Sequence, residues 1–146
     1  MAKPLPSTLA LWTRLMSASA EILAAVEAAL KAKGLPPLGW YDALLEIEKA
    51  GADGVRPFEL KERLLLPQSG MSRLLDRLAA ASYVIRLDCP EDGRGYVVAI
   101  TAEGRAVRRR MWPVYAETLV ARVETRLSPE EADAVTRALD RLRGRP

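Results

Sequence analysis

The 146-residue sequence contains no histidine and a single cysteine, Cys89. Without histidine, neither a Ser-His-Asp nor a Cys-His catalytic arrangement can form, and one cysteine makes neither an intramolecular disulfide nor a cysteine-based zinc site. The sequence also lacks a phosphate-binding glycine loop and a recognisable pair of catalytic acids. We therefore expect no catalytic residue, no metal site and no cofactor, and we expect that the protein is not an enzyme.

Long hydrophobic runs are scarce as well. Thr13 and Arg14 interrupt the N-terminal segment before a signal-peptide core can form, and the most apolar stretch, residues 22–30, is too short to span a bilayer. Hydrophobic residues still make up 49% of the chain, which is typical of a globular protein. The sequence therefore predicts a cytoplasmic protein of one domain, residues 1–146, with no membrane partner.

Positive charge is concentrated in the middle of the chain. Residues 56–110 carry 11 basic and 7 acidic side chains, a net charge of +4, whereas residues 1–55 have a net charge of −1 and residues 111–146 are neutral. A basic centre between ends without excess positive charge indicates a module that binds a polyanion.

Apolar periodicity predicts helices in the first half of the chain. A helix capped by Ser7 and Thr8 runs to about Lys33, and a second covers residues 38–50. Two short helices then follow with a brief turn between them, over residues 56–65 and 67–81. This spacing predicts a helix-turn-helix.

The period then changes to that of β-strands. Residues 84–88 and 96–100 are β-prone runs, and the proline and glycines between them predict a hairpin with an exposed tip. Thr101 caps a long helix to about Leu127, in which Pro113 predicts a kink. A capping box beginning at Ser128 opens the last helix, whose expected buried residues are Ala132, Val135, Leu139 and Leu142.

The polar face of the 67–81 helix carries small or hydrogen-bonding residues in its first turn and two guanidinium groups further along. Such residues at a helix N-terminus suit contacts to phosphates and base edges, and arginine can form two hydrogen bonds with guanine. A solvated polar face would look the same, but the hairpin that follows, with Arg94 at its tip, favours a winged helix on DNA. The residues on this face are Gln68, Ser69, Gly70, Ser72, Arg73, Asp76 and Arg77.

Four blocks in this order and spacing resemble the MarR family of winged helix-turn-helix transcription regulators. They are Leu60–Leu64, Ser72–Leu78, Asp88–Arg94 and Ile100–Gly104. The resemblance implies a mainly α fold with a small β-hairpin wing, in which a DNA-binding lobe (38–100) lies between N-terminal (1–37) and C-terminal (101–146) dimerisation helices. It also implies DNA contacts by Gln68, Ser69, Gly70, Ser72, Arg73 and Arg77, with Asp92 and Arg94 in the wing. In this chain Ser82 stands where the family usually has glycine.

Regulation by a small molecule is the other implication of the resemblance. In similar proteins a ligand crevice lies between the two lobes, and aromatic and methionine residues of the matching helices are candidates to bind a small aromatic or amphipathic effector. These candidates are Trp12, Met16, Trp40, Tyr41, Met111 and Tyr115. Packing in the core is the alternative role for all six. Cys89 is expected to have no redox role, and Arg108, Arg109 and Arg110 to be solvated or to pair across a dimer.

The sequence thus predicts a sequence-specific, double-stranded-DNA-binding transcription regulator. The expected form is a ligand-responsive repressor acting as a homodimer on a pseudo-palindromic operator. The alternative is a winged-helix protein–protein interaction module without DNA binding, which would require an apolar outer face on the 67–81 helix. That face is polar.

Overall fold

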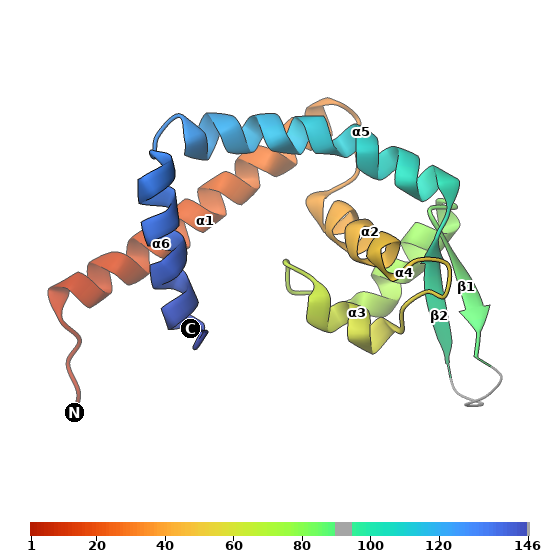
Figure 1. The fold of residues 1–146 in the computed structure, drawn as a ribbon, viewed down its shortest axis with the longest axis horizontal. Helices are drawn as coiled ribbons and strands as arrows, with labels where there is room; N and C mark the ends of the chain where they lie inside the picture. The colour runs from red at the N-terminus through yellow and green to blue at the C-terminus, as the bar shows by residue number, and fades with distance from the viewer. Residues whose placement is uncertain (90–94, 146) are drawn as a thin grey trace. The chain divides into compact units, whose positions relative to one another are not determined.

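The structure, a computed structural model, describes residues 1–89 and 95–145. Its elements follow the predicted order, mostly helical with one antiparallel hairpin (Figure 1). They are α1 (Pro6–Ala32), α2 (Leu38–Ala50), α3 (Pro57–Arg63), α4 (Met71–Ala80), β1 (Val84–Asp88), β2 (Tyr96–Ile100), α5 (Ala102–Leu119), the π-helix η1 (Val120–Glu124) and α6 (Pro129–Leu142). The predicted fold class is confirmed.

Residues 30–114 form one compact unit with a continuous apolar core. The core packs α2, α3 and α4 against the hairpin and the first part of α5. Its fully buried side chains include Leu44, Ile47, Leu60, Leu75, Leu78, Val84, Val98, Val107 and Met111. Burying a side chain of this size contributes roughly 1.5–3 kcal/mol, so this core holds the helix-turn-helix and the hairpin together.

The hairpin has the predicted strand boundaries, and one further bridge extends it. In the β1–β2 register, Val84 pairs with Ile100 and Asp88 with Tyr96. Val55, between α2 and α3, adds an isolated bridge to Val98, with both backbone hydrogen bonds at 2.9 Å. The loop before α3 is thereby attached to the edge of the hairpin.

The start of α5 is fixed by Thr101, as the sequence predicts. Its hydroxyl accepts a hydrogen bond from the Gly104 N–H at 3.0 Å and donates one to the Ser82 carbonyl at 2.6 Å. The helix continues through Pro113 to Leu119, and η1 replaces the α-helical geometry expected up to Leu127.

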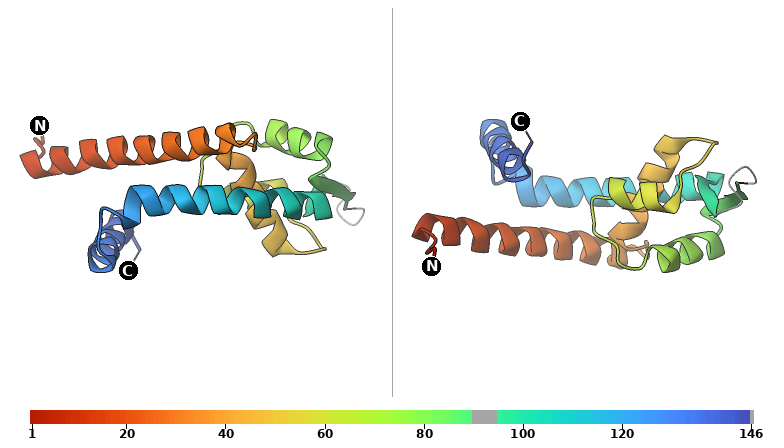
Figure 2. Two further views of the ribbon diagram at one scale, coloured as in Figure 1. Left: turned by 90° about the horizontal axis from the view of Figure 1, so that it is seen from above. Right: turned by 90° about the horizontal axis from the view of Figure 1, so that it is seen from below.

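Residues 1–29 and 115–146 form the second compact unit. Figure 2 shows α1 as one continuous helix. The capping box of α6 is present, because the Glu131 N–H donates to Ser128 Oγ at 3.1 Å and the Ser128 N–H to Glu131 Oε1 at 3.0 Å.

The prediction that α6 buries its apolar residues is wrong for the single chain. None of Ala132, Val135, Leu139 and Leu142 is buried, and Val135 and Leu142 are 47% and 62% exposed. On α1, Leu11, Trp12, Met16 and Leu23 are exposed as well. An amphipathic helix buries its apolar face only where a partner surface covers it, and one chain does not cover these faces.

The helix α1 extends well beyond residues 22–30, the stretch that the sequence analysis judged too short to span a bilayer. By length and composition alone, the 27-residue helix could cross a membrane. Core helices of soluble proteins and signal sequences near an N-terminus share this length and composition, so one such helix is not by itself evidence of a membrane span.

Candidate nucleic-acid interface

The helix α4 separates its residues into an apolar and a polar face. Leu74, Leu75 and Leu78 are buried in the core of the 30–114 unit. Exposed on the opposite face are Ser72, Arg73, Asp76 and Arg77. Neither Arg73 nor Arg77 forms an ion pair with the residues that the structure describes. Two guanidinium groups and a hydroxyl are therefore available to an external anion.

The start of α4 lies four residues later than predicted. The helix begins at Met71 after an N-cap at Gly70, so Gln68, Ser69 and Gly70 belong to the connection from α3 and not to the first helical turn. The prediction was wrong because Gly70 has the backbone angles φ −115° and ψ 51°, which are not helical, so a helix cannot run from Pro67 through this residue. Just before Pro67, residues 65 and 66 direct their backbone N–H groups to a side chain of α2. Gly70 offers no side chain to cap the first N–H groups of α4, and unsatisfied N–H groups at a helix N-terminus favour a bound anion.

Gln68 is half-buried and lies against α2. Its side-chain nitrogen Nε2 is 3.1 Å from the position that a β-carbon on Gly39 would occupy. Ser69 is exposed and Gly70 half-buried. Six candidate DNA-contacting residues lie in the described part of the chain. Ser72, Arg73 and Arg77 share the exposed face of α4, whereas Gln68 lies in the connection before α4 and packs against α2.

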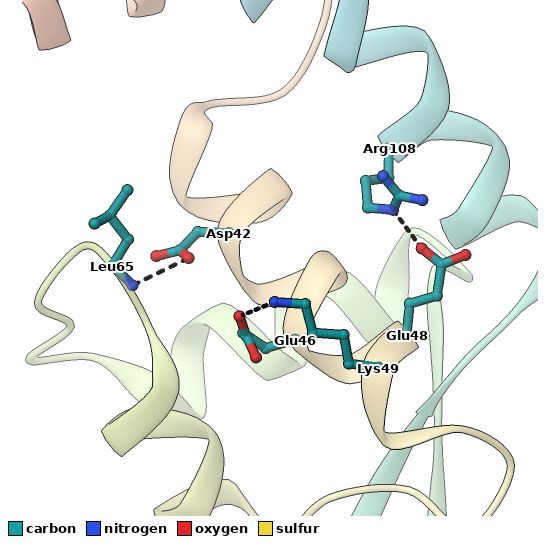
Figure 3. A network of polar contacts seen from close by, with 6 residues as sticks. All are labelled: Asp42, Glu46, Glu48, Lys49, Leu65 and Arg108. Carbon is teal, nitrogen blue, oxygen red and sulfur yellow. Dashed lines mark hydrogen bonds and ion pairs between the residues drawn. The ribbon is translucent and has the colours of Figure 1, made fainter. Parts of the chain in front are cut away.

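The side chain of α2 that accepts hydrogen bonds from the backbone N–H groups of residues 65 and 66 belongs to Asp42. The sequence analysis did not predict a role for this residue. Leu65 N donates to Asp42 Oδ1 at 3.1 Å, as Figure 3 shows, and Leu66 N donates to Oδ2 at 2.8 Å. A signal was present in the sequence, because a charged residue within the apolar face of a helix requires a partner.

The hairpin is tied to α4 by Arg86 on β1. The Arg86 guanidinium forms an ion pair with Asp76 of α4 and lies 5.0 Å from the centre of the Tyr96 ring on β2. The hydrogen bond to Asp76 raises the pKa of Arg86 above its ordinary value. Asp76 therefore links the hairpin to α4. Asp92 and Arg94, the candidate wing residues, lie outside the described residues.

A second polar cluster joins α2 to the first part of α5. Arg108 forms an ion pair with Glu48, and its guanidinium lies 5.8 Å from the centre of the Tyr41 ring, which stacks on Trp112 at 6.2 Å (Figure 3 shows the ion pair). Burial opposes the charge of Arg108, but the hydrogen bond that it donates to Glu48, the negative charge of Glu48 and the contact with Tyr41 together outweigh burial and raise the pKa of Arg108. The expectation that Arg108 is solvated or pairs across a dimer is wrong, because its partner lies in the same chain.

The candidate effector-binding residues are distributed over both compact units. Tyr41 and Met111 are buried in the 30–114 unit, where Trp40 also meets Tyr83 edge-to-face at 6.0 Å. On the other unit, Trp12 and Met16 are 58% and 50% exposed and Tyr115 is half-buried. Tyr41 and Met111 thus contribute to the core, and the effector site stays a prediction.

Comparison with known proteins agrees with this geometry. The sequence model of the MarR family matches residues 33–95. The multiple antibiotic resistance protein MarR of Salmonella typhimurium is 36% identical over 67 residues, which are 46% of this chain and 45% of that protein, so the match spans about half the length of this curated relative.

Solved structures match over much more of the chain. A MarR family transcriptional regulator from Streptomyces coelicolor, solved in complex with DNA, has a TM-score of 0.86 at 24% identity and covers 97% of this chain and 89% of its own. A MarR family transcriptional regulator from Silicibacter pomeroyi has a TM-score of 0.66 at 28% identity over 88% and 84% of the two chains. The resemblance to the MarR family is thus supported twice: residues 33–95 match the sequence model of that family, and the chain has the winged-helix fold of solved MarR family regulators.

Proposed function

We propose that the protein is a transcription regulator that binds double-stranded DNA in a sequence-specific way, with α4 in the major groove. One observation carries the proposal. The face of α4 opposite the core is exposed and displays Ser72, Arg73 and Arg77, the residue types that contact phosphates and guanine edges. A MarR family regulator of very similar fold was solved in complex with DNA, which supports the same assignment.

The protein acts as a homodimer in this proposal, in the cytoplasm. Exposed apolar side chains on α1 and α6, including Trp12 and Leu142, are the support, because a second copy would cover them. Two-fold symmetry then requires two half-sites whose centres lie about 10–10.5 base pairs, or a multiple of this, apart. In the same proposal the homodimer represses transcription while it is bound to DNA. A small aromatic or amphipathic effector then releases the protein from the DNA.

The alternative, a protein–protein module, finds less support. A docking surface on α4 would expose apolar side chains, whereas Leu74, Leu75 and Leu78 all face the core.

Selection from a random duplex library with the purified protein tests the proposal. We expect enrichment of a pseudo-palindrome, protection of both half-sites against cleavage, and a complex with two protein chains per duplex. Affinity should fall steeply with salt, because each neutralised phosphate releases counterions. A library that shows no enrichment, together with retention of the chain as a monomer, would overturn the assignment.

A further inference from the structure

Asp42 connects α2 to the chain segment that leads into the recognition helix. Its side chain is buried, with 7% of its surface exposed, and both carboxylate oxygens accept backbone N–H groups (Figure 3 shows the contact with Leu65). The donors lie 23 and 24 residues further along the chain. Because the donors are backbone groups, the contact fixes the path of the chain whatever side chains residues 65 and 66 carry.

The two N–H groups lie in a stretch without helical hydrogen bonds. Leu64 ends α3 with extended backbone angles, φ −67° and ψ 140°, and α4 does not begin until Met71. These partly buried donors need an acceptor, and an ionised carboxylate is a stronger acceptor than a neutral group. Asp42 is therefore what holds the first part of the α3–α4 connection.

A second contact comes from the same face of α2. Gly39 lies one helical turn before Asp42, and the Gln68 side-chain nitrogen Nε2 is 3.1 Å from the position that a β-carbon on Gly39 would take. Gln68 is two residues before Gly70, the N-cap of α4. The first half of α2 thus contacts both ends of the connection.

We propose that Asp42 is a positioning residue for DNA recognition, an inference that rests on the proposed function. Together with Gly39, it holds the α3–α4 connection so that α4 enters the major groove at the correct position. Base-edge hydrogen bonds form only over a narrow range of distance and angle, whereas attraction to phosphates acts over longer distances. Loss of the contact should therefore weaken binding to the selected sequence more than binding to unrelated DNA.

The experiment compares the full-length protein with Asp42→Asn, which keeps the size of the side chain but removes its charge. The matched control is Glu46→Gln, one turn further along α2, where the carboxylate pairs only locally with Lys49 at 3.0 Å. Affinities for a selected duplex and for a shuffled duplex are measured at one salt concentration. We expect the ratio of the two affinities to fall about tenfold in Asp42→Asn, equivalent to about 1.4 kcal/mol, and to stay unchanged in Glu46→Gln.

Hydrogen exchange without DNA reports on the contact independently of the proposed function. We expect the amides of Leu65 and Leu66 to be protected in the wild type and in Glu46→Gln, and to exchange faster in Asp42→Asn. A variant that only loses stability would instead exchange faster throughout the core and would lower both affinities equally.

Gly39→Ala provides a second variant in case Asp42→Asn does not fold. Alanine favours a helix more than glycine does, so the melting temperature should not fall, yet the added β-carbon would lie 3.1 Å from Gln68 Nε2 and must push this amide away by a few tenths of an ångström. We expect a reduced affinity ratio at undiminished stability, which a purely structural role does not produce.

Two results would overturn the inference. If the wild type binds a selected duplex and Asp42→Asn shows fast amide exchange with an unchanged affinity ratio, the connection does not position α4, and the proposed function stands. If the wild type binds no duplex, the proposed function fails and the inference fails with it, while the exchange data still report whether Asp42 holds the connection.

Discussion

Gly104 lies so close to the carbonyl oxygen of Tyr83 that no β-carbon fits between them. The Thr101 N–H donates to the same carbonyl at 3.1 Å, so the end of the hairpin and the start of α5 meet at this oxygen. Gly104→Ala must move one of the two backbone segments. We expect a loss of about 1–3 kcal/mol in the free energy of unfolding, the usual cost of overpacking, measured by urea denaturation.

Gly70→Ala is the matched control for this substitution. The β-carbon at Gly70 would have no neighbour nearer than 3.9 Å, so this variant should change the free energy of unfolding much less. Equal midpoints for the wild type and Gly104→Ala would show that the close approach to Tyr83 is absent in solution.

Ser82, after the recognition helix, has a left-handed backbone with φ 63°. It is the one non-glycine residue with a positive φ in the described part of the chain, at a position where glycine avoids the steric cost. Ser82→Gly should therefore raise the free energy of unfolding by about 1 kcal/mol. The opposite sign is expected for Ser72→Gly, because a glycine inside α4 weakens the helix; a lower midpoint for Ser82→Gly would contradict the argument.

Arg77 is exposed on the outer face of α4 and should contribute to DNA affinity. If it forms two hydrogen bonds with a guanine, Arg77→Ala should weaken binding to the selected duplex by about 1–3 kcal/mol and relax the preference at one base pair. Arg73→Ala should behave similarly. The control is Arg109→Ala, which removes the same charge from an exposed position on another helix, α5. Fluorescence anisotropy titrations should show a larger loss for Arg77→Ala and Arg73→Ala than for Arg109→Ala. Equal losses in all three variants would indicate only a general charge effect.

The ion pair between Glu48 and Arg108 should couple α2 to α5. Both side chains are largely buried, with 22% and 16% of their surfaces exposed, so removing one partner leaves the other without compensation. We expect Glu48→Gln and Arg108→Met to destabilise the fold singly and to be less than additive together. A double-mutant cycle in urea measures this coupling, and additive losses would mean that the pair does not form in solution.

The apolar face of α6 should be covered by a second copy in the active protein. Val135→Asp places a charge in that face and should shift the dimer towards monomer in sedimentation experiments. Thr136→Asp adds the same charge on the neighbouring polar face and should leave the dimer intact. A dimer that persists in Val135→Asp at low concentration would place the interface elsewhere.

Local signals in the sequence determined the boundaries of several elements. The strands 84–88 and 96–100, the cap at Thr101 and the capping box at Ser128 all lie where the sequence predicts them. Each depends on a short run of residues with high β-propensity or on hydrogen bonds between residues within four positions of each other. Such interactions form in the same way whatever the rest of the chain does.

Only the tertiary structure decided where α4 begins, what Arg108 binds and which apolar faces remain exposed. The helix starts at Met71 and not at Pro67 because the backbone at Gly70 is not helical, the preceding connection is held by hydrogen bonds to Asp42, and Arg108 meets a carboxylate 60 residues away in the chain. Local sequence patterns do not record contacts over such separations. The periodicity of α6 predicted an apolar face, but whether that face is buried depends on a covering surface, which the single chain does not supply.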